Sequence, residues 1–209
     1  MITIIDYGLG NTGALLNMFE FLGFEAQISD DPHAVACADQ LVLPGVGSFD
    51  RAMINLRERH LESPLKDAVL ERQAPVLGVC LGMQLLAHCS EEGGEAGLGL
   101  IAGQVKRISV PKDSKLKVPN IGWRAIRPTR PSVLFDPCLP QERFYFVHGY
   151  HMVCEESGNV AAVFDYGSEL CCAVEHRNIF GVQFHPEKSH RFGMRLLTAF
   201  ASRALGNRS

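Results

Sequence analysis

The sequence has no long hydrophobic run, no excess of basic residues and no paired-cysteine motif, and each absence excludes a class of protein. No stretch approaches the roughly 20 apolar residues that cross a bilayer, so we expect no membrane span. The 20 Lys and Arg residues against 23 Asp and Glu give a net charge of -3, which argues against a nucleic-acid or anionic-membrane surface. The 7 cysteines include no Cys-x-x-Cys pair, so we expect neither a disulfide framework nor a metal site.

The N-terminus also lacks the features of an export signal. The segment Met1 to Asp6 reads as a strand, without a basic region and with too short an apolar run for a signal peptide. Together with the unpaired cysteines, this predicts a reducing, cytoplasmic location. A chain of 209 residues that is 46% hydrophobic is ordinary for a globular protein, and we expect one domain over residues 1–209.

The first half of the chain alternates strand and helix patterns. This alternation predicts an α/β fold, with a largely parallel sheet covered by helices on both faces. Ser48 or Asp50 is expected to start the second helix, and Ser63-Pro64 to start the third. The expected strands cover 2–7, 24–28, 40–43 and 76–79, and the expected helices 12–22, 51–58 and 65–72.

The second half has a different pattern. Turn residues separate short apolar runs with few helices between them, which predicts additional antiparallel strands. Residues 91–97 are rich in Glu and Gly and are expected to form a solvated loop. The expected strands cover 104–110, 123–126, 143–147, 160–164, 170–175 and 179–184, and a final helix covers 190–205.

A cysteine stands between an expected strand and an expected helix. The segment Gly78-Val-Cys80-Leu-Gly82 has the spacing of the Gly-x-Ser-x-Gly nucleophile elbow, with cysteine in place of serine. Small neighbours permit a sharp turn, and a helix N-terminus favours the thiolate. From this segment alone, a catalytic thiol and a buried structural cysteine both remain open.

A histidine and a carboxylate follow the last expected strand. In an extended segment, residues two apart face the same side, so Glu187 can orient the ring of His185 as a general base. With Cys80 they would supply nucleophile, base and orienting group. Taken alone, His185 could equally be a satisfied histidine at a strand end beside a surface glutamate.

Glycine-rich turns suggest two further sites. Leu43-Pro44-Gly45-Val46-Gly47 ends an expected strand near the thiol, so its backbone N–H groups, with that of Leu81, could stabilise an oxyanion, unless the segment is only a flexible turn. Gly8-Leu-Gly10-Asn-Thr-Gly13 fits a dinucleotide fingerprint, with Asp30 or Asp31 near the position of a ribose-binding acid. Polar Asp6-Tyr7 fits that fingerprint poorly, and a tight strand-to-helix turn explains the glycines.

Taken together, the motifs resemble the class I (triad) glutamine amidotransferases, and within them the glutaminase subunits of imidazole glycerol phosphate synthase. The resemblance extends over essentially the whole chain and implies the flavodoxin-like fold of that class. The segments that carry it are Gly-Val-Cys80-Leu-Gly-Met-Gln84, Gln-Phe-His185-Pro-Glu187-Lys-Ser189, Asp6-Tyr-Gly-Leu-Gly-Asn11, Leu-Pro-Gly-Val-Gly47-Ser-Phe, Val118-Pro-Asn-Ile-Gly-Trp123 and Phe144-Tyr-Phe-Val-His148-Gly-Tyr150.

The resemblance implies that Cys80 attacks the glutamine side chain, with His185 and Glu187 completing the triad. The oxyanion would be held by backbone N–H groups of Leu81 and of Val46 or Gly47. No cofactor is implied. The implied substrate-binding residues are Gly45, Gln84, His148, Gly149 and Tyr150.

The resemblance also implies a heterodimer with a (β/α)8-barrel synthase partner, which would receive the ammonia. The sequence departs from the usual Pro-His-Met-Gly-Trp-Asn at Asn120, Ile121 and Arg124, and from Val-His-Ser-Tyr at Gly149. These departures leave open a paralogue that supplies ammonia to a surface-polysaccharide sugar amidination. The implied partner-interface residues are Asn11, Pro119, Asn120, Trp123 and Lys188.

Overall fold

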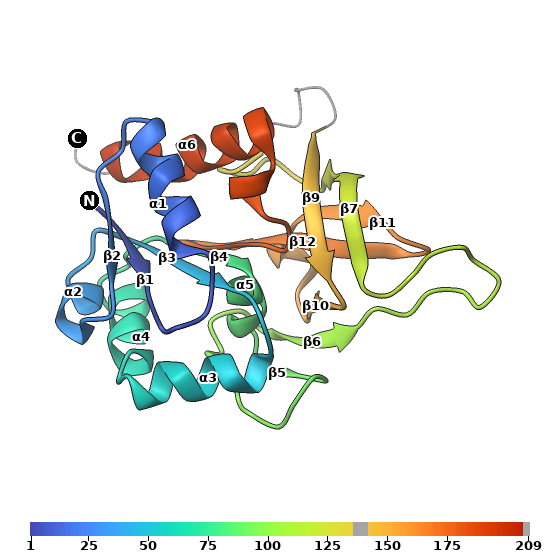
Figure 1. Cartoon of the computed structure of the whole chain (residues 1–209), viewed down its shortest axis with the longest axis horizontal. Helices are drawn as coiled ribbons and strands as arrows, with labels where there is room; N and C mark the ends of the chain where they lie inside the picture. Colours follow the sequence, from blue (N-terminus) through green and yellow to red (C-terminus); the bar gives the residue numbers. More distant parts are fainter. Residues whose placement is uncertain (136–141, 207–209) are drawn as a thin grey trace.

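The computed structural model describes residues 1–135 and 142–206, and side chains up to residue 202. Its centre is an eight-stranded sheet (Figure 1), and its strand order is β2-β1-β3-β4-β13-β12-β11-β8. The first five strands are parallel and the last three alternate in direction. In sheet order the strands are β2 (Ala26–Ser29), β1 (Ile2–Ile5), β3 (Gln40–Gly45), β4 (Val76–Cys80), β13 (Ile179–Val182), β12 (Glu169–His176), β11 (Val160–Asp165) and β8 (Arg127–Pro128).

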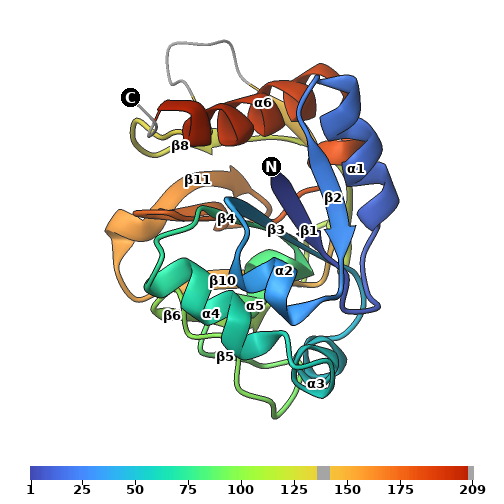
Figure 2. The same cartoon turned by 90° about the vertical axis from the view of Figure 1, so that its left-hand side faces the viewer.

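Helices cover both faces of this sheet, as Figures 1 and 2 show. The central parallel strands bury side chains on both faces, because alternate residues enter opposite cores. Leu41 and Leu43 pack in one core and Val42 in the other. One face carries α2 (Pro32–Ala36), α3 (Phe49–Glu58), α4 (Glu62–Leu70) and α5 (Leu81–Leu85), and the other carries α1 (Thr12–Phe21) and α6 (His190–Gly206).

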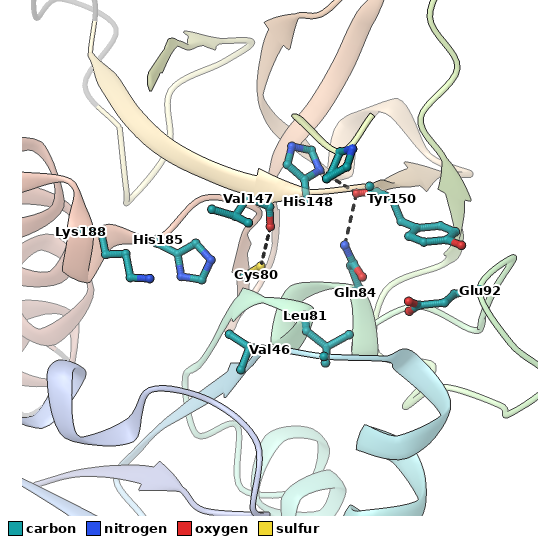
Figure 3. A pocket seen from close by; sticks show the side chains of 13 residues that line it. Val46, Cys80, Leu81, Gln84, Glu92, Val147, His148, Tyr150, His185 and Lys188 are labelled. Atoms are coloured by element: carbon teal, nitrogen blue, oxygen red, sulfur yellow. Dashed lines mark hydrogen bonds between the residues drawn. The ribbon is translucent and has the colours of Figure 1, made fainter. Parts of the chain in front are cut away.

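Two small sheets stand beside the antiparallel end of the central sheet. One has the order β10-β6-β5, and the other pairs β7 with β9 antiparallel. The turn from β9 to β10 lies over the carboxyl end of β4 (Figure 3). These strands are β10 (Tyr150–Cys154), β6 (Gly103–Arg107), β5 (Cys89–Ser90), β7 (Asn120–Ala125) and β9 (Arg143–His148), and two 3-10 turns are η1 (Ser157–Asn159) and η2 (Pro186–Lys188).

The predicted fold class is confirmed, but several elements differ from the local predictions. Helix α4 begins after Leu61 rather than after Ser63, and Pro64 fits because the first helical turn has no intrahelical partner for its N–H. Helix α2 was not predicted, although Asp31 followed by proline is a helix-start signal. Strand β3 extends to Gly45, beyond its expected end at residue 43. Pro44 is tolerated in it because β1 pairs with β3 only as far as Val42, so the missing proline N–H interrupts no ladder with β1.

No helix within residues 1–135 or 142–206 combines the length and apolar character of a membrane span.

Candidate active site

Cys80 lies where β4 ends and α5 begins. Its φ of 56° and ψ of −110° fall in a region that residues with a side chain rarely adopt. Holding a non-glycine residue there costs on the order of 1–3 kcal/mol, and such strain collects at functional sites. Strand, strained residue and helix follow one another as in a nucleophile elbow.

The glycines on either side of Cys80 are required by close backbone contacts. A Cβ at Gly82 would lie 1.8 Å from the carbonyl oxygen of Leu43, and one at Gly78 would lie 2.6 Å from the carbonyl oxygen of Gly82. No side chain fits at either position unless the backbone moves. The Gly-x-Cys-x-Gly spacing therefore has a steric cause in this chain.

The carboxylate of Glu187 contacts the ring of His185. Its Oε1 lies 2.8 Å from His185 Nδ1, and the two side chains are only 2% and 5% exposed. The pair was predicted from the alternation of an extended segment, but η2 brings the two residues together instead. The backbone of His185 is fixed to β9 by its N–H, which donates to the Tyr145 carbonyl at 2.9 Å.

The charge on His185 is stabilised by its neighbours. Burial alone lowers its pKa, but hydrogen bonds and charge interactions with Cys80 and Glu187 outweigh this and raise the pKa to about 10. An imidazolium at neutral pH can hold an adjacent thiolate and can donate a proton to a leaving group.

These groups open into a cavity of about 340 Å³ (Figure 3). His185 and Lys188 lie on one side of Cys80, and Gln84 and Glu92 on the other. The Cys80 Sγ lies 3.8 Å from the Val147 carbonyl oxygen. The lining residues are Val46, Gly47, Cys80, Leu81, Gln84, Glu92, Pro119, Val147, His148, Gly149, Tyr150, His185 and Lys188.

The end of β3 lies beside the nucleophile candidate. Gly45 pairs with Cys80 in the β3–β4 register, which places Val46 and Gly47 at the cavity. A Cβ at Gly45 would lie 2.6 Å from the Tyr7 hydroxyl and 2.8 Å from the Leu81 Cβ, so Gly45 is enclosed and does not line the cavity. Leu81 opens α5, where the first N–H groups have no intrahelical partner.

The opposite wall is formed by the turn from β9 to β10. The Tyr150 carbonyl accepts hydrogen bonds from His148 Nδ1 at 2.7 Å and from Gln84 Nε2 at 3.2 Å. Burial lowers the pKa of His148 to about 4, against the opposing effect of its bond to Tyr150, so the ring is neutral near pH 7. His148 therefore cannot replace His185 as a cationic acid.

Glu92 was not recognised as a site residue from the sequence. It belongs to the loop that was expected to be merely solvated, yet it lines the cavity. Its Oε2 accepts the N–H of Phe49 at 2.8 Å, at the start of α3, where Ser48 makes no side-chain cap. Asp50 fixes the same loop by accepting the N–H groups of Gly94 and Glu95. No local sequence pattern predicts this contact between Glu92 and Phe49, because the two residues are 43 positions apart.

Gln183 was also missed. It is fully buried one strand away from the elbow, with its Nε2 3.8 Å from the Cys80 Sγ and its Oε1 3.0 Å from Gln84 Nε2. In the sequence it is one polar residue in an apolar run before His185, which is the only signal that could have found it.

The glycine-rich loop after β1 forms a tight turn. Gly8 and Gly10 have φ angles of +85° and +120°, and a Cβ at Gly10 would lie 3.1 Å from the Pro44 side chain. Asp31 accepts the His33 N–H at 3.0 Å, which makes it the cap of α2. The position of Asp31 is therefore explained by its role as a helix cap, without a bound dinucleotide.

The described residues hold no group of three or more His, Cys, Asp or Glu suited to a metal ion. Cys138 lies outside the described residues, and the cysteines described are free: Cys37, Cys80, Cys89, Cys154, Cys171 and Cys172.

Comparison of the sequence with known protein families identifies the family of this chain. The family model "Glutamine amidotransferase class-I" matches residues 3–203. The chain belongs to the class I glutamine amidotransferases. Two of its curated relatives are named imidazole glycerol phosphate synthase subunit HisH 2, from Methanococcus maripaludis, and subunit HisH, from Leptospira interrogans. The first is 45% identical over 98% of this chain and 100% of the relative, and the second is 46% identical over 97% and 100%.

Solved structures share the fold. A glutamine amidotransferase of known crystal structure superposes with a TM-score of 0.73 at 19% identity, over 99% of this chain and 100% of that one. PurLQS from Thermotoga maritima gives a TM-score of 0.74 at 20% identity, over 100% and 98%. At these identities the likeness concerns the fold alone.

Four of the five expected interface residues lie at the surface or half-buried. Asn11 and Pro119 are exposed, as is Lys188, and Trp123 is half-buried with its ring stacked 5.4 Å from that of His190. Asn120 differs because it is fully buried and bonds to His148, so it offers no surface to a partner. Its amide also bonds to Arg124, so two of the positions that depart from the usual family motif contact each other.

Proposed function

We propose that this chain is the glutaminase subunit of an imidazole glycerol phosphate synthase. It would hydrolyse glutamine to glutamate and ammonia, and would pass the ammonia to a (β/α)8-barrel subunit in histidine biosynthesis. The observation that carries this proposal is the buried His185–Glu187 pair, joined with the strained Cys80 at one cavity. Relatives that bear this subunit's name at 45% and 46% identity over nearly the whole chain support it.

The chemistry follows from the three side chains. The Cys80 thiolate attacks the side-chain amide carbon of glutamine, and the carbonyl electrons move to the oxygen. N–H groups of Leu81 and of Val46 or Gly47 stabilise that oxyanion. His185 then protonates the departing nitrogen, so that ammonia leaves and a thioester to Cys80 remains. His185 next deprotonates a water that attacks the thioester, and glutamate is released.

Glutamine binding uses the walls of the same cavity. Gln84, Tyr150 and the backbone at His148 and Gly149 all line it. We assign the glutamine α-ammonium group to Glu92, because its carboxylate lies in the cavity and is fixed by the Phe49 N–H. A cavity of about 340 Å³ is compatible with a single amino acid.

The partner would dock at the mouth of this cavity. Val46 and Ile121 are exposed apolar residues, 44% and 56% accessible, and Val46 lines the cavity. Pro119 and Lys188 line the same opening and are themselves exposed. A barrel subunit over this surface would cover the exit and receive ammonia without its passage through bulk water.

The decisive experiment measures glutamine hydrolysis by the chain with and without a histidine-pathway barrel partner that carries its nucleotide-like ligand. We expect turnover in the complex, and its loss in Cys80→Ser, whereas Cys37→Ser at an exposed thiol behaves as wild type. Turnover that survives Cys80→Ser would overturn the mechanism. Stimulation only by a synthase of polysaccharide sugar amidination would overturn the assignment to histidine biosynthesis.

A further inference from the structure

A buried polar contact joins β7 to the wall of the cavity. Asn120 on β7 stands directly opposite His148 on β9 in the antiparallel register, and Asn120 Nδ2 lies 3.0 Å from His148 Nε2. Asn120 is 0% exposed and His148 5% exposed, so the contact between them is shielded from bulk water. Any loss of this contact leaves a buried polar atom without its bond.

The direction of each bond in this contact is fixed by its neighbour. Arg124 Nε donates to Asn120 Oδ1 at 3.0 Å, and because a guanidinium has only donors, the Asn120 oxygen must face Arg124. The Asn120 NH2 group therefore faces His148 and donates to Nε2. The other ring nitrogen, Nδ1, must carry the hydrogen, because its partner is the Tyr150 carbonyl at 2.7 Å. Arg124 thus selects the orientation of Asn120, and the Asn120 donor together with the Tyr150 carbonyl selects the Nδ1–H tautomer of His148.

Arg124 is itself held in place. Its guanidinium lies 5.0 Å from the centre of the Tyr166 ring, in a cation–π arrangement. The Tyr166 hydroxyl donates to the Lys117 carbonyl at 2.7 Å, which fixes the ring. Arg124, the first donor in this chain of contacts, is therefore held by Asn120 on one side and by the Tyr166 ring on the other.

The same contacts continue to the nucleophile candidate. The Tyr150 carbonyl that accepts from His148 also accepts from Gln84 Nε2 at 3.2 Å. Gln84 Nε2 donates in turn to Gln183 Oε1 at 3.0 Å, and Gln183 Nε2 lies 3.8 Å from Cys80 Sγ. A continuous line of hydrogen bonds thus runs from Arg124 on β7 to the thiol.

We propose that Arg124 and Asn120 are positioning residues for glutamine binding, and that they act by holding His148 against the Tyr150 carbonyl. Neither residue lines the cavity, so neither contacts substrate. His148, Gly149 and Tyr150 do line it. Asn120, oriented by Arg124, bonds to the ring of His148 at the start of the turn that carries them. This inference rests on the glutaminase function proposed above. A merely structural cluster would change stability without a selective change in KM.

The test compares Arg124→Ala and Asn120→Ala with wild type in the complex with the barrel subunit. Each is expected to raise KM for glutamine about threefold to tenfold, the effect of one lost hydrogen bond, with kcat within about twofold. The double variant is expected to match the single ones, because both act on one chain of contacts. Arg124→Lys should have a KM between those of Arg124→Ala and the wild type, since an ammonium can still donate to Asn120 Oδ1.

Arg127→Ala is the matched control, because Arg127 is an exposed arginine paired with Glu169 and lies outside this chain of contacts. It is expected to keep the wild-type KM. Four results would each overturn the proposal. They are an unchanged KM in both test variants, a fall in kcat as large as the rise in KM, a raised KM in Arg127→Ala, and additive effects in the double variant.

A measurement without turnover separates this proposal from the proposed function. Nitrogen NMR of His148, assigned by its disappearance in His148→Gln, should show the Nδ1–H tautomer in the wild type. Asn120→Ala and Arg124→Ala should shift it towards a mixture of tautomers. A tautomer that does not respond overturns the positioning role, whereas absent glutamine hydrolysis by the wild-type complex overturns the glutaminase function.

Discussion

The Glu187 carboxylate bonds to Nδ1 of His185 at 2.8 Å, and within the described residues its second oxygen is buried without a hydrogen-bond partner. This carboxylate is therefore dedicated to the imidazole. It fixes the ring so that Nε2 is available to the reacting groups, which is the role of the third member of a nucleophile–base–orienter arrangement.

Glu187→Gln should lower kcat for glutamine about 100-fold or more, the scale of an oriented acid–base group. The amide keeps the shape of the side chain but supplies no charge to stabilise the imidazolium. The measurement is steady-state ammonia release in the complex. Glu156→Gln, at an exposed carboxylate, is the control and should match wild type. A Glu187→Gln enzyme within threefold of wild type would remove Glu187 from the mechanism.

The backbone of Cys80 leads to a prediction on stability. Because its φ is 56°, Cys80→Gly should be more stable than Cys80→Ala by about 1 kcal/mol, although both are inactive. At Glu20, an exposed residue within α1, the order should reverse, with glycine about 0.5–1 kcal/mol less stable than alanine. Urea unfolding of the four variants measures both differences. The same order at the two positions would show that Cys80 stores no strain.

Substitution by alanine should have opposite effects on stability at Gly82 and at Gly13. Gly82→Ala places a Cβ 1.8 Å from the Leu43 carbonyl oxygen and should destabilise the fold by about 3 kcal/mol or more. Gly13 lies in α1, and a Cβ added there would meet nothing within 4 Å, so Gly13→Ala should stabilise by about 0.5–1 kcal/mol. Thermal unfolding of both variants checks the signs, and a stable Gly82→Ala protein would contradict the close approach of β3 to the elbow.

Stability should fall with rising pH through His185. Its pKa is about 10 in the folded chain and near the ordinary 6.5 when unfolded, so between these values His185 carries a proton in the folded chain that it lacks in the unfolded chain. The stabilisation is complete below pH 6.5 and is lost towards pH 10, with a slope of at most about 1.4 kcal/mol per pH unit. The free energy of unfolding of wild type minus His185→Gln, measured from about pH 6 to 10, should show this decline. A constant difference would show that His185 binds no extra proton.

The three residues of the proposed triad could be predicted from the sequence because each lies in a short local motif. The Cys80 elbow needs glycines two residues away on each side, and His185 and Glu187 are two residues apart. Strands β1, β3, β4 and β13 were predicted because buried parallel strands form continuous apolar runs.

Residues whose role depends on distant contacts could not be predicted in this way. Glu92 reaches the cavity only because α3 lies beside its loop, and a glutamate-rich segment otherwise indicates solvent. Asn120 lies inward because β9 places His148 opposite it. An expected surface residue thus became a buried one through a pairing that no local pattern contains.

Glu92 provides a test of how the substrate is recognised. Glu92→Gln should raise KM for glutamine about tenfold to a hundredfold, because a charge-assisted hydrogen bond to the α-ammonium group is lost. The amide oxygen can still accept the Phe49 N–H, so the start of α3 should be preserved. For 4-carbamoylbutanoate, which is glutamine without its α-amino group, the same change should have little effect.

The neighbouring Glu91→Gln is the matched control for that comparison. Glu91 accepts the Arg107 N–H at 2.8 Å, is exposed, and does not line the cavity. It should leave KM unchanged for both substrates, because its carboxylate meets neither. If Glu92→Gln weakens glutamine and 4-carbamoylbutanoate equally, its effect comes from the shape of the loop, and the α-ammonium group must be bound elsewhere in the cavity.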